Sequence, residues 1–184
     1  MGPNDTPIQV RSYDASWPAA FEGLAADIRS ALGSTARRVD HIGSTAVPQL
    51  AAKPTIDIQV AVDNIEDLDR YRLALEHVGY TFHVNSLRDE DHRFFSLPGR
   101  VAHVHICTAG GDWERRHLLF RDYLRAHVDV GTDYEHLKYR LAEVHPDDRV
   151  AYADAKTEFV DHVMADADRW AAETGWRPPG QQAG

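Results

Sequence analysis

The segment from Thr55 to Val62 constrains the fold of this chain more than any other part. β-branched aliphatic side chains occupy every second position, and Asp57, Gln59 and Ala61 lie between them. Because successive side chains of a strand point to opposite faces, the pattern predicts a strand with one apolar and one more polar face. Asp57 and Gln59 therefore point the same way, on the face of a sheet opposite its apolar core.

Helices and further strands are predicted on both sides of this segment. Pro18 follows Trp17 at the first turn of a helix, and apolar side chains recur at helical spacing until Gly33. A second helix is capped by Asn64 and stopped by Gly79. Further strands are predicted at residues 38–42, 80–84, 93–97 and 101–108.

The chain after Gly110 and Gly111 is predicted to be helical. Helices are expected over residues 113–127, 132–144 and 147–174, the second starting at a capping box, Thr132-x-x-Glu135. Prolines after Trp176 prevent further helix. The fold class is α/β, a small mixed sheet flanked by helices with a C-terminal helical segment. The expected organisation is a flexible lead-in (1–12), an α/β core (13–110), a helical segment (111–174) and a disordered tail (175–184).

The composition limits the classes of function. With 184 residues, 43% hydrophobic and 27% charged, the chain suits an ordinary soluble globular protein. Its formal net charge of −9 disfavours non-specific binding to nucleic acid. No apolar run is long enough for a membrane span and no signal peptide is visible, so a cytoplasmic protein is expected. The single cysteine, Cys107, fits a reducing compartment and is interpreted as a core thiol.

The turn after the strand at residues 38–42 carries the strongest functional signal. A glycine at Gly43 lets the backbone approach phosphate oxygens, and the hydroxyl of Ser44 with the N–H groups around Thr45 can donate to them. A carboxylate on the next strand, Asp57, would then hold the divalent cation that offsets phosphate charge. This layout is typical of nucleotidyltransferase sites. The alternatives are an ordinary tight turn and a structural ion pair of Asp57, with Lys53 as a partner.

Several motifs along the chain together resemble the signature of the GrpB-like family. They are Tyr13-Asp14-Ala15-Ser16-Trp17, His41-Ile42-Gly43-Ser44-Thr45-Ala46-Val47-Pro48, Ala51-Ala52-Lys53-Pro54, Asp57-Ile58, His92-Arg93-Phe94-Phe95, His103-Val104-His105, Phe120-Arg121-Asp122-Tyr123-Leu124 and Tyr134-x-x-Leu137-Lys138. The resemblance covers residues 13–167 and implies a nucleotidyltransferase-like fold, which some dephospho-coenzyme A kinases carry as a fused domain. It implies no settled reaction. Gln49 stands where the family motif has a glycine.

The second carboxylate of an Asp-x-Asp arrangement is absent, because Gln59 follows Asp57. His103 and His105 share one face of the strand at 101–108, and an alternating His-x-His pair can bind one metal ion. If that strand lies beside the Asp57 strand, the two histidines and Asp57 form an Asp/His₂ cluster, with His41 and Gln59 as further candidate ligands. The competing interpretation is a pair of hydrogen-bonded structural histidines.

Basic side chains are required as well, because one cation cannot neutralise a triphosphate. Lys53 lies close before the Asp57 strand, and Arg93 could offer a guanidinium fork to phosphate. Lys138 is a further candidate, and Lys156 ranks last because it lies far along the helical segment.

Three functions are consistent with these residues. The first is a nucleotide-dependent transferase with Asp57, His103 and His105 as catalytic or metal-binding residues, using Mg²⁺ or Mn²⁺ and a nucleoside triphosphate. The second is a non-catalytic nucleotide or anion sensor. The third is a metal enzyme that uses zinc, iron or copper on a non-nucleotide substrate. The expected partner is in each case a small molecule or nucleotide; the oligomeric state is not predicted.

Overall fold

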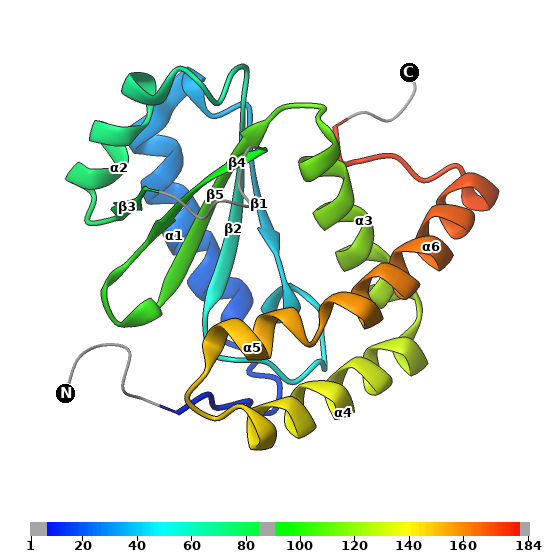
Figure 1. Ribbon diagram of the computed structural model, residues 1–184. Coiled ribbons are helices and arrows are strands. Elements are labelled where there is room, and N and C mark those ends of the chain that lie inside the picture. The colour runs from blue at the N-terminus through cyan, green and yellow to red at the C-terminus, as the bar shows by residue number, and fades with distance from the viewer. Residues whose placement is uncertain (1–6, 85–90, 181–184) are drawn as a thin grey trace.

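The computed structural model describes residues 7–84 and 91–180 and contains one mixed five-stranded sheet between two layers of helices (Figure 1). The order of the strands is β1-β2-β5-β4-β3. The strands are β1 (Arg38–Ile42), β2 (Ile56–Val62), β3 (Thr81–His83), β4 (His92–Ser96) and β5 (Ala102–Thr108). The α-helices are α1 (Trp17–Leu32), α2 (Arg72–His77), α3 (Asp112–Ala126), α4 (Val128–Val144), α5 (Arg149–Asp154) and α6 (Thr157–Thr174).

Strand β2 is the segment whose alternation is clearest in the sequence, and it lies beside β5, the adjacency on which the proposed cluster depended. It pairs antiparallel with β1 and parallel with β5. The parallel register sets Asp57 opposite His103 and Gln59 opposite His105. Because paired residues of neighbouring strands point to the same face, these four side chains share one side of the sheet.

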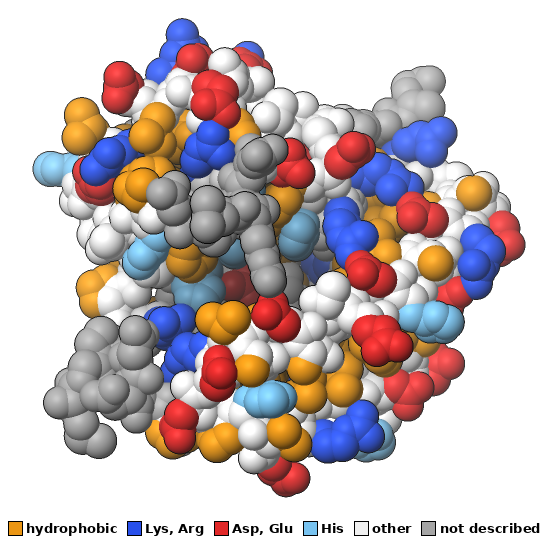
Figure 2. Space-filling view, viewed as in Figure 1, with side chains coloured by type: hydrophobic (Ala, Val, Ile, Leu, Met, Phe, Trp, Pro, Cys, Tyr) orange, Lys and Arg blue, Asp and Glu red, His pale blue; other side chains and the backbone are white. Residues whose placement is uncertain are grey.

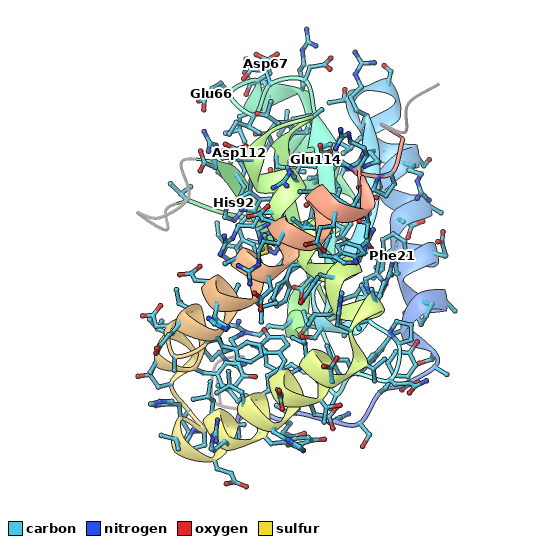
Figure 3. The ribbon with its side chains drawn as sticks, turned by 90° about the vertical axis from the view of Figure 1, so that its right-hand side faces the viewer. Phe21, Glu66, Asp67, His92, Asp112 and Glu114 are labelled. Carbon is cyan, nitrogen blue, oxygen red and sulfur yellow. The ribbon has the colours of Figure 1, made fainter. Side chains whose placement is uncertain are left out.

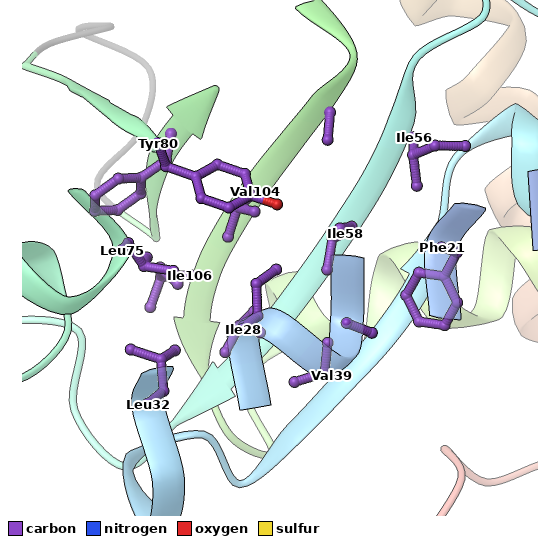
Figure 4. Packing of buried hydrophobic residues seen from close by; sticks show 14 of the residues in the cluster. Phe21, Ile28, Leu32, Val39, Ile56, Ile58, Leu75, Tyr80, Val104 and Ile106 are labelled. Atoms are coloured by element: carbon purple, nitrogen blue, oxygen red, sulfur yellow. The ribbon is translucent and has the colours of Figure 1, made fainter. Parts of the chain in front are cut away.

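The opposite side of the sheet packs on α1 and α2 and forms the main hydrophobic core. Phe21 and Ile28 of α1 meet Ile58 and Val104 of the sheet, as Figure 4 shows. Tyr71 is completely buried in this core, and its hydroxyl donates to the carbonyl oxygen of Ile65 at 2.5 Å. The predicted apolar face of β2 therefore forms the centre of this core.

A second hydrophobic cluster lies among the C-terminal helices rather than on the sheet. Leu119 and Tyr123 of α3, Tyr134 of α4 and Met164 of α6 pack with Val47 from the chain between β1 and β2. The polar side of the sheet thus lies between two separate hydrophobic clusters. A sheet side lined by polar groups between two cores is a suitable place for a ligand site.

The predicted fold class is confirmed, and so are the first helix and the predicted strands within the described residues. The helix predicted to start at Asn64 is wrong in its first half. The side chain of Asn64 accepts from the backbone N–H of Glu66, which makes a local turn, and the chain passes through a 3₁₀ turn at Leu68–Arg70 before α2 begins. An asparagine side chain stabilises such a turn as readily as it caps a helix.

The predicted capping box is also wrong. Helix α4 begins at Val128, so Thr132 lies within it and donates its hydroxyl to the carbonyl oxygen of Val128. Glu135 instead accepts from the backbone N–H of Ala51. The last predicted helix is two helices, α5 and α6, separated around Lys156.

The described parts of both termini, which belong to the expected lead-in and tail, have contacts with the body of the protein. Ile8 is buried and Arg11 pairs with Ala52 through two backbone hydrogen bonds. Near the other end, the indole N–H of Trp176 donates to Asp122, and the carbonyl oxygen of Pro179 accepts from Arg38. Residues 1–6 and 181–184, which these predictions also covered, lie outside the described residues.

The free edge of β1 is covered by arginine side chains. Arg29 of α1 donates to the carbonyl oxygen of Val39, and Arg121 of α3 donates to that of His41 at 3.0 Å. These carbonyls belong to alternate residues, which in an antiparallel pair are the ones that point away from the partner strand. Among the described residues, no helix is long and apolar enough to cross a membrane.

Candidate functional site

The turn at Gly43 lies directly against Asp57. Strand β1 ends at Ile42, and Gly43 then adopts φ 70° and ψ −173°, a conformation that is essentially restricted to glycine. A Cβ atom at this position would lie 2.5 Å from the Oδ2 atom of Asp57, well inside van der Waals contact. Gly43 is therefore needed both for the turn and for the approach of Asp57.

Asp57, His103 and His105 form a compact cluster that could hold a metal ion. One ligand atom from each lies within 4.8 Å of the others. His103 Nδ1 lies 3.1 Å from Asp57 Oδ1, and the two side chains are 18% and 31% exposed, so the cluster opens toward solvent. Within the described part of the chain, buried nitrogens of both imidazoles, Nε2 of His103 and Nδ1 of His105, have no hydrogen-bond partner. A buried nitrogen without a hydrogen-bond partner costs free energy. A metal ion that bound to these nitrogens, or turned the rings so that they found partners, would remove that cost.

The protonation states at neutral pH favour metal binding. Burial opposes ionisation of Asp57, but the hydrogen bond with His103 and the nearby charges, including that of Lys53, lower the pKa of its carboxyl group. Burial lowers the pKa of His105 to about 3. At pH 7 the cluster therefore presents a carboxylate and a neutral imidazole at His105, the forms that coordinate metals.

Two further candidate ligands are not brought into the cluster. His41 lies on the opposite side of the sheet, stacked on Phe21 with ring centroids 4.7 Å apart, and its Nε2 is 3.0 Å from the hydroxyl of Thr45. Gln59 shares the side of the cluster but is completely buried, and within the described residues neither atom of its amide has a hydrogen-bond partner.

The two hydroxyl residues after Gly43 have different surroundings. The Ser44 hydroxyl accepts from Lys138 Nζ at 3.1 Å and faces the helices. Thr45 is buried and donates its hydroxyl to the carbonyl oxygen of Thr55. Of the two, Ser44 is the one placed to meet a phosphate. Gln49 has φ 66°, so the turn keeps the conformation that a glycine would adopt at this position.

All three lysines of the chain converge on this region. The sequence contains 20 basic residues other than histidine, and only Lys53, Lys138 and Lys156 are lysines. The ammonium nitrogens of Lys53 and Lys156 lie 4.9 and 4.7 Å from the centre of the same ring, that of Tyr152. Within the described residues, neither forms an ion pair with a carboxylate. Half-buried ammonium groups that lack an ion-pair contact could accommodate an added anion.

Lys138 has a different position, as part of the wall that holds the turn. It is almost fully buried and donates to the carbonyl oxygen of Ala51 and to Ser44, while Glu135, one helical turn before it, accepts from the N–H of Ala51. Burial and then the charge of Lys156 lower the pKa of Lys138 to about 7. Burial likewise lowers the pKa of Lys156 to about 8, against the opposing attraction of Asp57.

The lowered pKa of Lys138 predicts a free energy of unfolding that rises with pH. Between pH 7 and the ordinary lysine pKa of 10.5, the unfolded chain holds a proton on Lys138 that the folded chain has lost. Unfolding therefore takes up a proton, and the free energy of unfolding increases by up to about 1.4 kcal/mol per pH unit across this window. Urea unfolding of wild type and Lys138→Met at pH 7, 8 and 9 measures it. A difference between the two proteins that does not change with pH would contradict the prediction.

Arg93, predicted to bind phosphate, lies on the other side of the sheet from the cluster. It pairs in register with Ile106, and its guanidinium donates to Glu66 at 2.6 Å. Lys156, the basic residue that the sequence favoured least as a phosphate ligand, lies at the site instead. The break between α5 and α6 places it there, and no local sequence signal marked that break.

The space-filling view shows the site as a hollow between the sheet and the C-terminal helices, with histidine and basic side chains around it (Figure 2). The edge-on view shows that His92 lies on this side of the sheet and Phe21 on the core side (Figure 3). Trp113 of α3 stacks on His92 and His117, with ring centroids 4.7 and 3.6 Å away, and lies 5.3 Å from His105. An aromatic wall thus borders the cluster. A separate surface pocket of about 730 Å³, near Arg125 and Trp176, contains none of these residues.

Comparison with known proteins agrees with this architecture. The family model described as GrpB protein matches residues 7–166. The chain belongs to the GrpB family. The crystal structure of the conserved GrpB protein from Enterococcus faecalis superimposes with a TM-score of 0.79 and 36% sequence identity, covering 88% of this chain and 99% of that one. The GrpB fold is therefore shared along nearly the whole length.

Relatives of this GrpB-family chain occur alone and within longer proteins. UPF0157 protein SCO7215 of Streptomyces coelicolor is 41% identical over 159 residues, which cover 86% of this chain and 83% of the relative. A dephospho-CoA kinase of Mycolicibacterium paratuberculosis is 32% identical over 94% of this chain, which spans only 49% of the kinase. The predicted relation to a domain of dephospho-coenzyme A kinases is thereby confirmed.

Proposed function

We propose that this protein is a metal-assisted transferase that moves a phosphoryl or nucleotidyl group from a nucleoside triphosphate to a small acceptor. The observation that carries the proposal is the cluster of Asp57, His103 and His105, whose carboxylate interacts electrostatically with Lys53 and Lys156, two lysines that form no ion pair within the described residues. A site with a cation position and separate ammonium groups suits a ligand that carries several negative charges close together.

Each part of the hollow has a role in this proposal. Gly43 gives the ligand access to backbone N–H groups, and Ser44 offers a hydroxyl beside them. Lys53 and Lys156 neutralise the terminal phosphates. A divalent ion held by the cluster would orient the transferred group and offset its charge. Catalysis would rest mainly on positioning and charge neutralisation.

The proton of the acceptor needs a base, and the two histidines differ in this respect. The low pKa of His105 makes it a weak proton acceptor at neutral pH. His103 is the better candidate, because its Nδ1 lies 3.1 Å from Asp57 Oδ1, a contact that orients the imidazole. We propose that His103 gives up its bond to the ion to take this role during turnover, while His105 ligates the ion throughout.

A non-catalytic sensor of nucleotides is the second candidate, and Gln59 favours it. Two-metal transfer depends on bridging carboxylates, and the residue two positions after Asp57 is a neutral, completely buried amide. A sensor would bind the triphosphate without consuming it. Incubation of the nucleotide-bound protein with candidate acceptors, followed by chromatography of the nucleotide, separates the two candidates.

Calorimetric titration of metal-stripped protein with ATP, with and without Mg²⁺ or Mn²⁺, tests the anion site. We expect micromolar, cation-dependent binding, weakened about tenfold or more by Lys53→Met and again by Lys156→Met, since each substitution removes a charge-assisted contact. Arg70→Met/Arg140→Met removes the same total charge as the double lysine variant, from exposed positions, and serves as its control.

An independent readout follows from the three-lysine composition. An amine-selective acetylating reagent can modify only three side chains and the α-amino group, so the mass of the intact protein reports on the site. ATP should slow modification of Lys53 and Lys156 and leave the α-amino group unaffected. Equal labelling with and without ATP, together with no heat of binding, would rule out the proposed anion site.

A further inference from the structure

The donor atoms of the cluster allow a sharper statement about its metal. We infer that Asp57, His103 and His105 select a divalent first-row transition metal ion, such as Zn²⁺, Fe²⁺ or Mn²⁺, over Mg²⁺. The inference deepens the proposed function, and rests on it in taking this cluster as the site's cation position.

The chemistry of the ligands carries the inference. Mg²⁺ is bound by oxygen, through carboxylates and retained waters, and the cluster supplies one carboxylate only. Two imidazoles with one carboxylate on one side of an ion instead match sites for zinc and for non-haem iron. The neutral Gln59 stands where a second carboxylate would have favoured magnesium.

The geometry brings one ligand atom of each residue within 4.8 Å of the others. Ligands at right angles around an ion, with bonds of about 2.1 Å, lie about 3 Å apart. Asp57 Oδ1 and His103 Nδ1 are separated by 3.1 Å. All three ligands belong to two strands paired in parallel, with Asp57 opposite His103 and His105 two residues further on. Because the residues lie on a rigid sheet, little reorganisation is needed on binding.

The positive charges around the cluster disfavour the binding of Mg²⁺ in the absence of a nucleotide. Asp57 is the cluster's single carboxylate, and Lys53 and Lys156 both interact electrostatically with it. Mg²⁺ would therefore gain little without a phosphate ligand and should enter with the nucleotide. A transition metal ion, held by imidazole nitrogen, gains two bonds that these ammonium groups do not weaken directly.

The test uses full-length, metal-stripped protein and the metal ions alone, without nucleotide. We expect Zn²⁺ to bind at one equivalent and at least about 100-fold more tightly than Mg²⁺, with Mn²⁺ between them. Bound Co²⁺ should show the visible absorption bands of nitrogen coordination. His105→Asp should weaken Zn²⁺ at least about tenfold and strengthen Mg²⁺, and the same change at exposed His136 should alter neither.

The outcomes separate this inference from the proposed function. Mg²⁺ binding as tightly as Zn²⁺, or no binding of any transition metal ion, overturns the inference, even where ATP still binds with Mg²⁺. Stoichiometric Zn²⁺ binding without any ATP binding supports the inference and removes the proposed transferase. If His105→Asp does not fold, as judged by circular dichroism, His105→Gln with the same titrations takes its place.

Discussion

Replacing Gly43 by alanine is expected to destabilise the protein and abolish metal binding at the cluster. The new Cβ atom would lie 2.5 Å from the Asp57 carboxylate, so either the turn or Asp57 must move. The backbone conformation of Gly43 is also unfavourable for any residue with a side chain. Together these effects should lower the free energy of unfolding by about 3–5 kcal/mol, as expected for strain combined with overpacking.

Gly99→Ala is the matched control for this variant. Gly99 also has a positive φ, 67°, but a Cβ atom there would meet no heavy atom within 4 Å. The Gly99→Ala substitution should lower the free energy of unfolding by about 1–2 kcal/mol, from the backbone conformation alone. Urea unfolding of both variants, with Zn²⁺ titrations, measures the difference. Equal destabilisation of the two variants would show that contact between Gly43 and Asp57 is unimportant.

Asp57→Asn is expected to reduce metal affinity at least about 100-fold while the protein stays folded. The amide keeps the shape of the side chain but removes the negative charge, the one anionic ligand of the cluster. Losses of groups that merely orient a ligand already cost about 10–100-fold, so loss of a ligand should cost at least as much. Titration calorimetry with Zn²⁺, and with ATP and Mg²⁺, gives both affinities.

Thermal unfolding provides the check on this variant. Burial opposes the charge of Asp57, so the neutral amide removes a desolvation cost and also weakens the hydrogen bond with His103. These effects oppose each other, and the metal-free melting temperature should change little. Unchanged metal affinity in a well-folded Asp57→Asn would refute the role of the cluster, and a large loss of stability would assign Asp57 a structural role instead.

The sequence was sufficient to predict the cluster, because the relevant signals are local. Strict alternation in β2 and β5 places Asp57, His103 and His105 on defined strand faces, and only the adjacency of the two strands had to be assumed. The faces of His41 and Arg93 could not be assigned in the same way. Their strands are short and have polar residues on both faces, so the pattern does not show which side is buried.

Lys138, Lys156 and Glu135 show why the other wall of the site was harder to predict. They lie on helices far along the chain, and their approach depends on how those helices pack, which no spacing encodes. The capping box at Thr132 matched a local motif inside a longer helix. One usable signal was overlooked. A chain that prefers arginine almost everywhere keeps lysine at three positions only, and these meet in space.

The arginines along β1 restrict association through this edge of the sheet. A peptide strand could extend the sheet at this edge only by displacing Arg29 and Arg121 from the carbonyl oxygens of Val39 and His41. Displacing Arg121 would also remove a hydrogen bond between α3 and the end of β1, next to Gly43. Docking of a strand here, or edge-to-edge aggregation, would therefore disturb the ligand site. A strand that paired with this edge would therefore have to compete with both arginines.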